Sequence, residues 1–259
     1  MTPRSDVKAR AVELHTEQAQ EFFDRYKLLE RDPYASTFTY GRHKIEGLIE
    51  RETRSIRPGS RALDVGCGTG FNVARLLDRG FETVGVEPAD GMRSIARANV
   101  PGAEIVDGDF EHLPFPDQSF DLLLAIEVLR YLPGPDLALR EAARVLRKGG
   151  VAIVTAAPRW SLNGYALVNV VTSRRQVPSF TRVDHSFVSA RGGRAALRRA
   201  GFRDADVHGV FLGPWHVLGR VSPRALSVTL RTFEPVDDAL ADRWPWRDLA
   251  NHLVLVGRT

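Results

Sequence analysis

The sequence has a single cysteine, Cys67, among its 259 residues. One thiol excludes an internal disulfide and any metal site built from several cysteines. Long apolar runs are absent too: the longest, residues 122–126, is far shorter than the roughly 20 residues that a membrane-spanning helix needs. The first residues also lack the apolar segment of a signal peptide. We therefore expect a cytoplasmic protein with no membrane span and no metal site.

Lysine is scarce as well, since only four of the 36 basic residues are lysine. We attribute this arginine bias to GC-rich codon usage, and we therefore do not interpret the net charge of +4 as evidence for a nucleic-acid partner. The arginines between Arg191 and Arg199 fall on one predicted helix, where we interpret them as a solvated face. An apolar content of 43% and a charged content of 26% are typical of a globular protein.

Glycine, in contrast, is concentrated in one short stretch. Over residues 61–70 an apolar run ends in an acid, three glycines follow at alternate positions, and a helical pattern continues over residues 71–78. This order predicts a strand, a tight loop and a helix. Glycines in such a loop permit positive φ angles and let the backbone lie directly against a ligand. The stretch therefore predicts a cofactor site.

The details of the loop indicate which cofactor it binds. A dinucleotide loop is spaced G-x-G-x-x-G, whereas here the third glycine comes one residue early, at Gly70. Asp64 is a poor neighbour for phosphates but a good one for a cation. Residues 63–70, LDVGCGTG, resemble the first motif of the class I S-adenosylmethionine (SAM)-dependent methyltransferases, in particular the small-molecule branch that includes ubiquinone-biosynthesis enzymes.

Two further stretches support this resemblance. Glu87 ends the next predicted strand 17 residues after Gly70, where a carboxylate can accept hydrogen bonds from both ribose hydroxyls. Residues 108–115 resemble the family element GDxxxLPF, whose aspartate binds the adenine amino group. Residues 127–132 resemble a turn whose backbone lines the sulfonium, and they lack the Pro-Pro-aromatic sequence of enzymes that methylate nucleobases.

The resemblance implies a set of cofactor-binding residues. They are Asp64, Gly66, Cys67, Gly68, Gly70, Glu87, Met92, Asp109, Phe110, Ile126, Arg42 and Tyr40. In the family, an arginine in the place of Arg42 meets the methionine carboxylate, but pairing with Glu46 four residues later is an equal alternative.

The rest of the chain alternates predicted strands and helices, which builds a parallel sheet. The resemblance implies an α/β fold with a doubly wound, seven-stranded sheet in the order 3-2-1-4-5-7-6, its last strand antiparallel, and helices on both faces. We expect effectively one domain, with a helical lid over residues 1–57 and the SAM-binding domain over 58–259. Insertions at 158–187 and 212–250 would form the acceptor site.

Three helices are also predicted from the pattern of apolar residues. One amphipathic helix should cover residues 5–30, and a second should cover residues 42–56 after an aromatic loop. A helix over 136–146 should end in a glycine cap at residues 148–150.

These features predict a SAM-dependent methyltransferase that acts on a small molecule, most simply at oxygen. The aromatic-rich segments suggest a phenol, a quinone precursor, a polyketide or a sugar-type metabolite as acceptor. Methyl transfer to carbon or nitrogen, a SAM-binding protein without catalysis, and an RNA methyltransferase stay open as alternatives, as does the oligomeric state. If a general base is used, histidine is best suited to the role. We expect His185 first, then His43, then His216.

Overall fold

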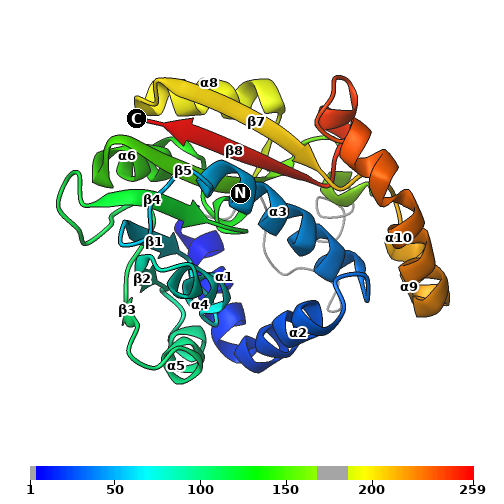
Figure 1. The fold of residues 1–259 in the computed structure, drawn as a ribbon, viewed down its shortest axis with the longest axis horizontal. Helices are drawn as coiled ribbons and strands as arrows, with labels where there is room; N and C mark the ends of the chain where they lie inside the picture. Colours follow the sequence, from blue (N-terminus) through cyan, green and yellow to red (C-terminus); the bar gives the residue numbers. More distant parts are fainter. Residues whose placement is uncertain (1–3, 168–185) are drawn as a thin grey trace.

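The computed structural model describes residues 4–167 and 186–259. Its core is one mixed sheet in the order β3-β2-β1-β4-β5-β8-β7 (Figure 1). Its strands are β1 (Arg61–Val65), β2 (Glu82–Val86), β3 (Glu104–Val106), β4 (Phe120–Ala125), β5 (Leu146–Pro158), β7 (Asp204–Val210) and β8 (His252–Arg258). Only β8 runs antiparallel to its neighbours, β5 and β7. The predicted strand order is therefore confirmed.

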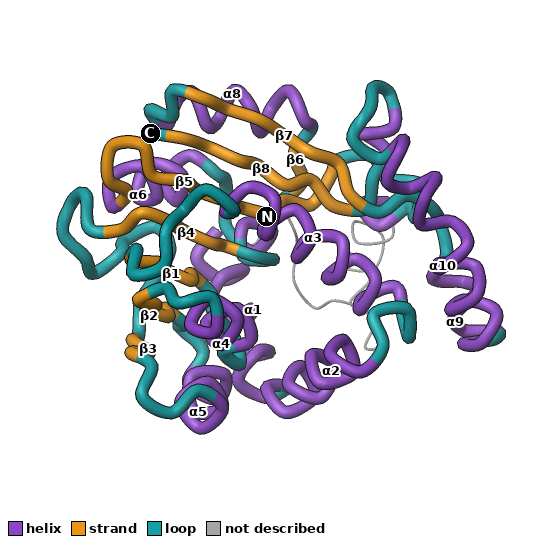
Figure 2. Tube along the Cα trace, viewed as in Figure 1, coloured by secondary structure: helices purple, strands orange, loops and turns teal. Residues whose placement is uncertain are grey.

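An eighth strand, β6 (Phe187–Val188), pairs with the end of β5 and was not predicted. Two residues are too few to show a strand pattern in the sequence. Figure 2 shows this short strand beside the long central ones.

Helices cover both faces of the sheet, and each layer buries one set of strand side chains. Helices α6 (Asp136–Val145) and α8 (Ala190–Ala200) pack in one cluster with Leu63, Leu123 and Leu255. On the other face, α3 (Thr37–Thr53) and α4 (Phe71–Asp78) pack against Leu122 and its neighbours, and α5 (Asp90–Asn99) continues this layer over β3. The central strands are thus buried on both sides, as parallel strands require.

The N-terminal region differs from the prediction in its helix boundaries. The single helix expected over residues 5–30 is two helices, α1 (Arg4–Glu17) and α2 (Ala19–Arg31), because the backbone leaves helical geometry at Gln18. Helix α3 begins five residues earlier than predicted, so the expected aromatic loop is partly helical. Ser36 causes this, since its side chain and that of Thr39 form a reciprocal capping box.

The glycine cap predicted at residues 148–150 was wrong. Helix α6 ends at Val145, and the backbone becomes extended at Leu146 (ψ 137°), where β5 begins. Gly149 lies within this strand at φ +80° and donates a hydrogen bond to the carbonyl of Thr259. The glycines at 149 and 150 therefore lie within β5, which begins earlier than predicted, and they do not cap a helix.

The segment 212–250 contains helices, as predicted: α9 (His216–Val221), α10 (Pro223–Leu240) and the 3-10 helix η2 (Trp246–Leu249). Among residues 4–167 and 186–259, every helix is too short or too polar to traverse a bilayer.

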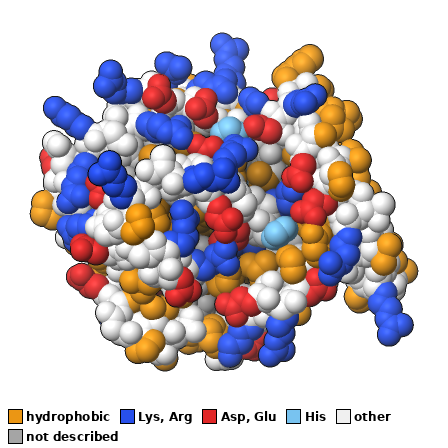
Figure 3. Space-filling model, in the orientation of Figure 1, with side chains coloured by type: hydrophobic (Ala, Val, Ile, Leu, Met, Phe, Trp, Pro, Cys, Tyr) orange, Lys and Arg blue, Asp and Glu red, His pale blue; other side chains and the backbone are white. Residues whose placement is uncertain are grey.

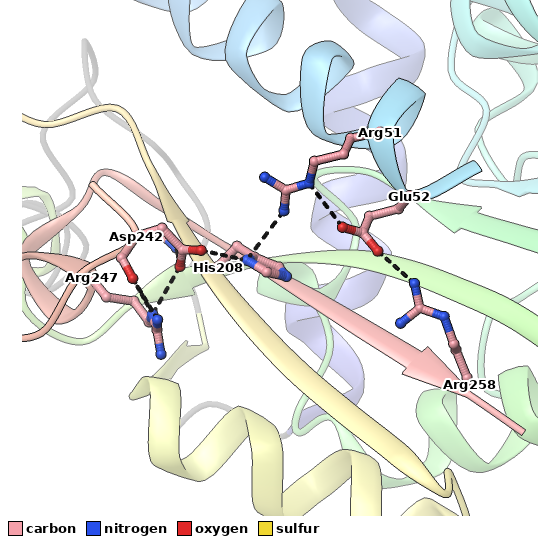
Figure 4. Close-up of polar contacts among 7 residues, drawn as sticks. Arg51, Glu52, His208, Asp242, Arg247 and Arg258 are labelled. Atoms are coloured by element: carbon pink, nitrogen blue, oxygen red, sulfur yellow. Dashed lines mark hydrogen bonds and ion pairs between the residues drawn. The ribbon is translucent and has the colours of Figure 1, made fainter. Parts of the chain in front are cut away.

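A polar network ties α3 and the segment after α10 to the outer strands β7 and β8 (Figure 4). His208 Nδ1 lies 2.7 Å from Asp242 Oδ2 and 3.5 Å from Arg51 Nη2. Next to it, Arg258 Nη2 donates to Glu52 at 2.6 Å. These contacts hold α3 in a fixed position on the sheet.

A second, buried contact joins α3 to α10 and involves a residue predicted to bind the cofactor. Tyr40, expected to bind cofactor, is fully buried against Phe211 and Leu230, and its hydroxyl donates to Asp237 Oδ2 at 3.0 Å. The other oxygen of Asp237 accepts the Leu212 amide at 2.8 Å. Tyr40 therefore links α3 to the C-terminal insertion, and its contact with the cofactor stays a prediction.

We expect Tyr40→Phe to lower the free energy of unfolding by about 1–3 kcal/mol, because Asp237 Oδ2 would stay buried without a partner. Denaturant unfolding measures this loss. Tyr34→Phe is the control, since its hydroxyl bonds the more exposed Glu234 and its removal should cost less. If Tyr40→Phe has normal stability but has lost SAM affinity, Tyr40 binds the cofactor and does not stabilise the fold through Asp237.

Candidate functional site

The glycine loop between β1 and α4 is held in a conformation that only glycine adopts easily. Gly66, Gly68 and Gly70 all have positive φ angles, at 66°, 56° and 85°. A Cβ atom at Gly66 would lie 2.3 Å from a methyl of Val128, and one at Gly70 would lie 3.0 Å from Val100. A Cβ at Gly68 would meet nothing within 4 Å. Packing thus requires two of the glycines, whereas Gly68 presents bare backbone to open space.

Glu87, just after β2, fixes this loop from the neighbouring strand. One carboxylate oxygen accepts the Gly68 amide at 2.9 Å, and the other accepts the Ala89 amide at 2.8 Å. The side chain is buried, and burial raises the pKa of Glu87 despite these two hydrogen bonds. Each oxygen keeps a further lone pair for a ligand.

Asp64, at the end of β1, is fully buried beneath the loop. Its Oδ1 accepts a hydrogen bond from Asn72 at 3.3 Å, and its Oδ2 has no partner among the described residues. Burial raises the pKa of Asp64 to about 7. A buried acceptor without a partner is costly, so this oxygen marks a place where a cationic ligand would be stabilised.

A cavity of about 580 Å³ lies above the loop and the adjoining strand ends. Seven predicted residues line it, namely Gly66, Gly68, Glu87, Met92, Asp109, Phe110 and Ile126. Asp64, Cys67 and Gly70 do not line it. Cys67 points the other way, into a core cluster with Val73 and Ile105. Its predicted contact can therefore come only from the backbone.

The N-terminal helices form the opposite wall of this cavity, with side chains of α1 and α2 such as Ala11, Phe22 and Tyr26. Lys8 of α1 pairs with Asp109, the residue predicted to bind adenine, and lies 3.1 Å from Glu111 Oε2. This pair could not be predicted from local sequence patterns, because Lys8 and Asp109 are 101 positions apart.

Arg42 satisfies one of its two predicted roles in this structure. Its Nη2 donates to Glu46 at 2.7 Å and to the Asn72 side chain at 2.9 Å. The side chain is only 2% exposed, and its Nε and Nη1 have no partner in the described part of the chain. The pairing with Glu46 is therefore formed, and two buried donors remain available for a carboxylate.

A second cavity of about 220 Å³ adjoins the first. Phe38, Glu127, Arg130 and Tyr165 line both. Since the shared residues come from the N-terminal helices, the turn after β4 and the segment after β5, the two cavities meet at the carboxyl ends of the central strands. Ligands of open α/β sheets bind at this edge.

Glu127 is the most constrained residue at this junction. Its backbone has φ +66°, its amide donates to Thr155 Oγ1 at 2.6 Å, and its carboxylate pairs with Arg130. His252 Nδ1 lies 3.2 Å from its Oε1. Burial alone would raise the pKa of Glu127, but Arg130 and His252 hold it well below the usual range. Glu127 therefore stays ionised.

The sequence prediction assigned only backbone roles to this turn and missed Glu127, Arg130 and His252. An acid directly after a buried central strand, with an arginine three residues later, was the available signal. His252 gave none, because it begins a predicted strand, whereas the histidine candidates were chosen beside the variable and aromatic segments.

Two of the three histidines predicted as general bases lie in the described part of the chain. His43 is half-buried, lies 3.4 Å from Glu234 and lines neither cavity, so the structure adds no support for its catalytic role, which stays a prediction. His216 lines the second cavity. His185 lies outside the described residues, as does most of the predicted insertion at 158–187. Among the described residues, no cluster of three or more His, Cys, Asp or Glu side chains could hold a metal ion.

Comparison with known proteins identifies the family. A model described as a methyltransferase domain matches residues 63–154. A ubiquinone biosynthesis O-methyltransferase from Ruegeria pomeroyi is 30% identical over 203 residues, which cover 74% of this chain and 81% of that protein. This chain belongs to the SAM-dependent methyltransferases. The family predicted from residues 63–70 is thereby confirmed.

Other similarities of this methyltransferase are partial or structural. A fatty-acid O-methyltransferase from Mycolicibacterium smegmatis is 36% identical over 136 residues, covering 50% of this chain and 49% of that protein. The matches to the first curated relatives span 28% to 67% of their length. A SAM-dependent methyltransferase from Thermotoga maritima, titled a possible histamine N-methyltransferase, has the same fold. Its TM-score is 0.62 at 23% identity, with 95% of this chain and 98% of that chain covered.

The cofactor of this methyltransferase is SAM, and the residues present fit it. SAM is a nucleoside that carries an ammonium, a carboxylate and a sulfonium. The unpartnered oxygen of Asp64 suits a cationic group, the free donors of Arg42 suit a carboxylate, and Gly68 leaves room for close approach.

We expect Asp64→Asn to stabilise the ligand-free methyltransferase at about pH 8 and to weaken SAM binding at least tenfold. The pKa of Asp64 is raised in the folded state, so the wild type loses stability as the pH rises from about 4 to about 7. The neutral amide removes this loss, but it also removes the anion that binds a cation. Melting temperatures at about pH 5 and pH 8 measure the first effect, and calorimetry measures the second.

In this experiment the stability advantage of Asp64→Asn should shrink toward acidic pH. A constant difference between the two proteins, with unchanged SAM affinity, would show that Asp64 is neither destabilised by ionisation nor in contact with the cofactor.

Proposed function

We propose that this methyltransferase binds SAM in the larger cavity and methylates an oxygen atom of a small molecule held in the smaller one. The observation that carries this proposal is the junction of the two cavities at Phe38, Glu127, Arg130 and Tyr165. A methyl donor on one side of this junction would face an acceptor on the other. Alignment of this kind can supply about 7–11 kcal/mol of the barrier reduction.

Individual residues would hold the cofactor as follows. Glu87 would accept hydrogen bonds from the ribose through the lone pairs that the Gly68 and Ala89 amides leave free. Asp64 would bind the ammonium, and Arg42, which lines the smaller cavity, would reach the carboxylate across the junction of the two cavities. Asp109 and Phe110 would meet the adenine, with Lys8 as the competing partner of Asp109. When bound, SAM supplies an activated methyl group whose leaving group is a neutral thioether.

The smaller cavity suits an aromatic or apolar acceptor that carries a hydroxyl. Phe38, Phe211 and Tyr165 give it aromatic walls, and Asn163 and Asn251 add polar contacts. Its volume of about 220 Å³ would admit a compact molecule. Two relatives are named O-methyltransferases, one of ubiquinone biosynthesis and one of fatty acids, which supports oxygen as the acceptor atom.

Methyl transfer to nitrogen or carbon would use the same cofactor site. RNA methylation is less favoured, because Lys and Arg side chains are interspersed with Asp and Glu on the face drawn in Figure 3 rather than gathered in one basic stripe. A SAM-binding protein without catalysis would need the larger cavity for the cofactor, but it would not need the smaller cavity for an acceptor.

The proposal is tested by incubating the protein with SAM and one of three acceptors, namely 3,4-dihydroxybenzoate, decanoate or histamine. Mass spectrometry should find S-adenosylhomocysteine together with an O-methylated product from one of the first two. Methylation of histamine alone would move the proposal to nitrogen. A protein that is thermally stabilised by SAM, and not by NAD, but methylates none of the three would contradict the assignment of the smaller cavity to such acceptors.

A further inference from the structure

We infer that His252 is the general base that removes the proton from the acceptor hydroxyl, with Glu127 as its positioning residue. This inference rests on the proposed function, because it assigns the base for methyl transfer to oxygen. His252 begins β8, next to the central strand β5, and its side chain lines the smaller cavity. Of the predicted histidines that the structure describes, His43 lies outside this cavity and pairs with Glu234, and His216 lines the cavity.

The imidazole and the carboxylate are already in contact. Nδ1 of His252 lies 3.2 Å from Oε1 of Glu127, which is within ion-pair distance. Nδ1 is buried, and its orientation gives it no hydrogen bond within the described residues. Catalytic pairs are often imperfectly aligned without substrate and tighten when it binds.

Glu127 is held in place more firmly than a surface acid would be. A non-glycine residue at φ +66° is strained, and such strain persists only where surrounding contacts impose it. Thr155 accepts the Glu127 amide and donates to its Oε1 at 3.1 Å, while Arg130 pairs with the carboxylate. The strained turn therefore brings a fixed negative charge to the junction of the two cavities.

This arrangement determines which imidazole nitrogen can act. A carboxylate beside Nδ1 favours the proton on Nδ1, which leaves Nε2 as the acceptor. Nε2 faces Gly41 of α3, where a Cβ atom would lie only 3.1 Å away. Glycine at this position keeps the space beside Nε2 free of a side chain.

The proposed step accounts for every proton and electron pair. The hydroxyl proton of the acceptor passes to Nε2 of His252, and the hydroxyl oxygen forms the new O–C bond. The electron pair of the broken S–C bond stays on sulfur, which becomes neutral. The imidazolium then returns its proton to water. The charged and titratable side chains that line the smaller cavity with His252 are Glu127, Arg130, Arg42, Tyr165 and His216.

The first test needs no acceptor. We would record two-bond ¹⁵N–¹H spectra of the full chain labelled with ¹⁵N-histidine, and assign His252 from the signals missing in His252→Asn. The wild type should show the Nδ1–H tautomer, and Glu127→Gln should shift the population toward Nε2–H. A wild-type Nε2–H tautomer, or one that Glu127→Gln leaves unchanged, would overturn the inference.

The second test measures turnover with 3,4-dihydroxybenzoate. His252→Asn should lower kcat at least 100-fold and remove the loss of activity at acidic pH, while S-adenosylhomocysteine affinity stays within twofold of wild type. His112→Asn, which changes an exposed histidine outside both cavities, should behave as wild type. If His252→Asn does not fold, Gly41→Ala replaces it, because its Cβ would crowd Nε2 and should lower kcat about tenfold.

The two tests separate the inference from the proposed function. Wild-type turnover that survives in His252→Asn with its pH profile unchanged overturns the inference and leaves O-methylation intact. If the wild type methylates no oxygen acceptor, the proposed function fails, and the tautomer measurement still decides whether Glu127 positions His252.

Discussion

The hydrogen bond from the Gly68 amide to the Glu87 carboxylate is the contact on which the site depends most. It joins the loop after β1 to the end of β2, and it holds Gly68 where its bare backbone faces the larger cavity. The positive φ angles of the loop would be strained in any residue with a side chain. One buried carboxylate thus shapes the cofactor loop and also offers lone pairs to a ligand.

The charged side chains near this contact differ in how many hydrogen-bond partners they have. In the described part of the chain, Asp64 keeps one buried polar atom without a hydrogen-bond partner and Arg42 keeps two, whereas Glu127 is surrounded by partners and stays ionised. Unsatisfied buried groups cost stability in the free protein, and a ligand that satisfies them recovers this energy on binding. The unpartnered atoms of Asp64 and Arg42 therefore lower the stability of the free protein, and they also make its site suitable for a charged ligand.

Local sequence signals predicted the parts of the structure that local physics determines. The apolar run before Asp64, the glycine spacing and the acid at position 87 predicted the loop and carried the family resemblance, and that resemblance implied the strand order. Contacts between distant segments could not be predicted this way. The pairing of Lys8 with Asp109, the burial of Tyr40 against Asp237 and the approach of His252 to Glu127 all arise when the N-terminal helices and the last strand pack onto the sheet. Periodicity in one segment carries no information about such partners.

Calorimetry with S-adenosylhomocysteine on the wild type and on Gly68→Ala tests the central claim most directly. A Cβ at Gly68 meets no protein atom within 4 Å, so this variant should stay folded while its methyl group occupies the space of the ligand. We expect one equivalent of ligand to bind the wild type, and binding to Gly68→Ala to be at least tenfold weaker. No binding to a well-folded wild type, or equal binding to both proteins, would contradict the account.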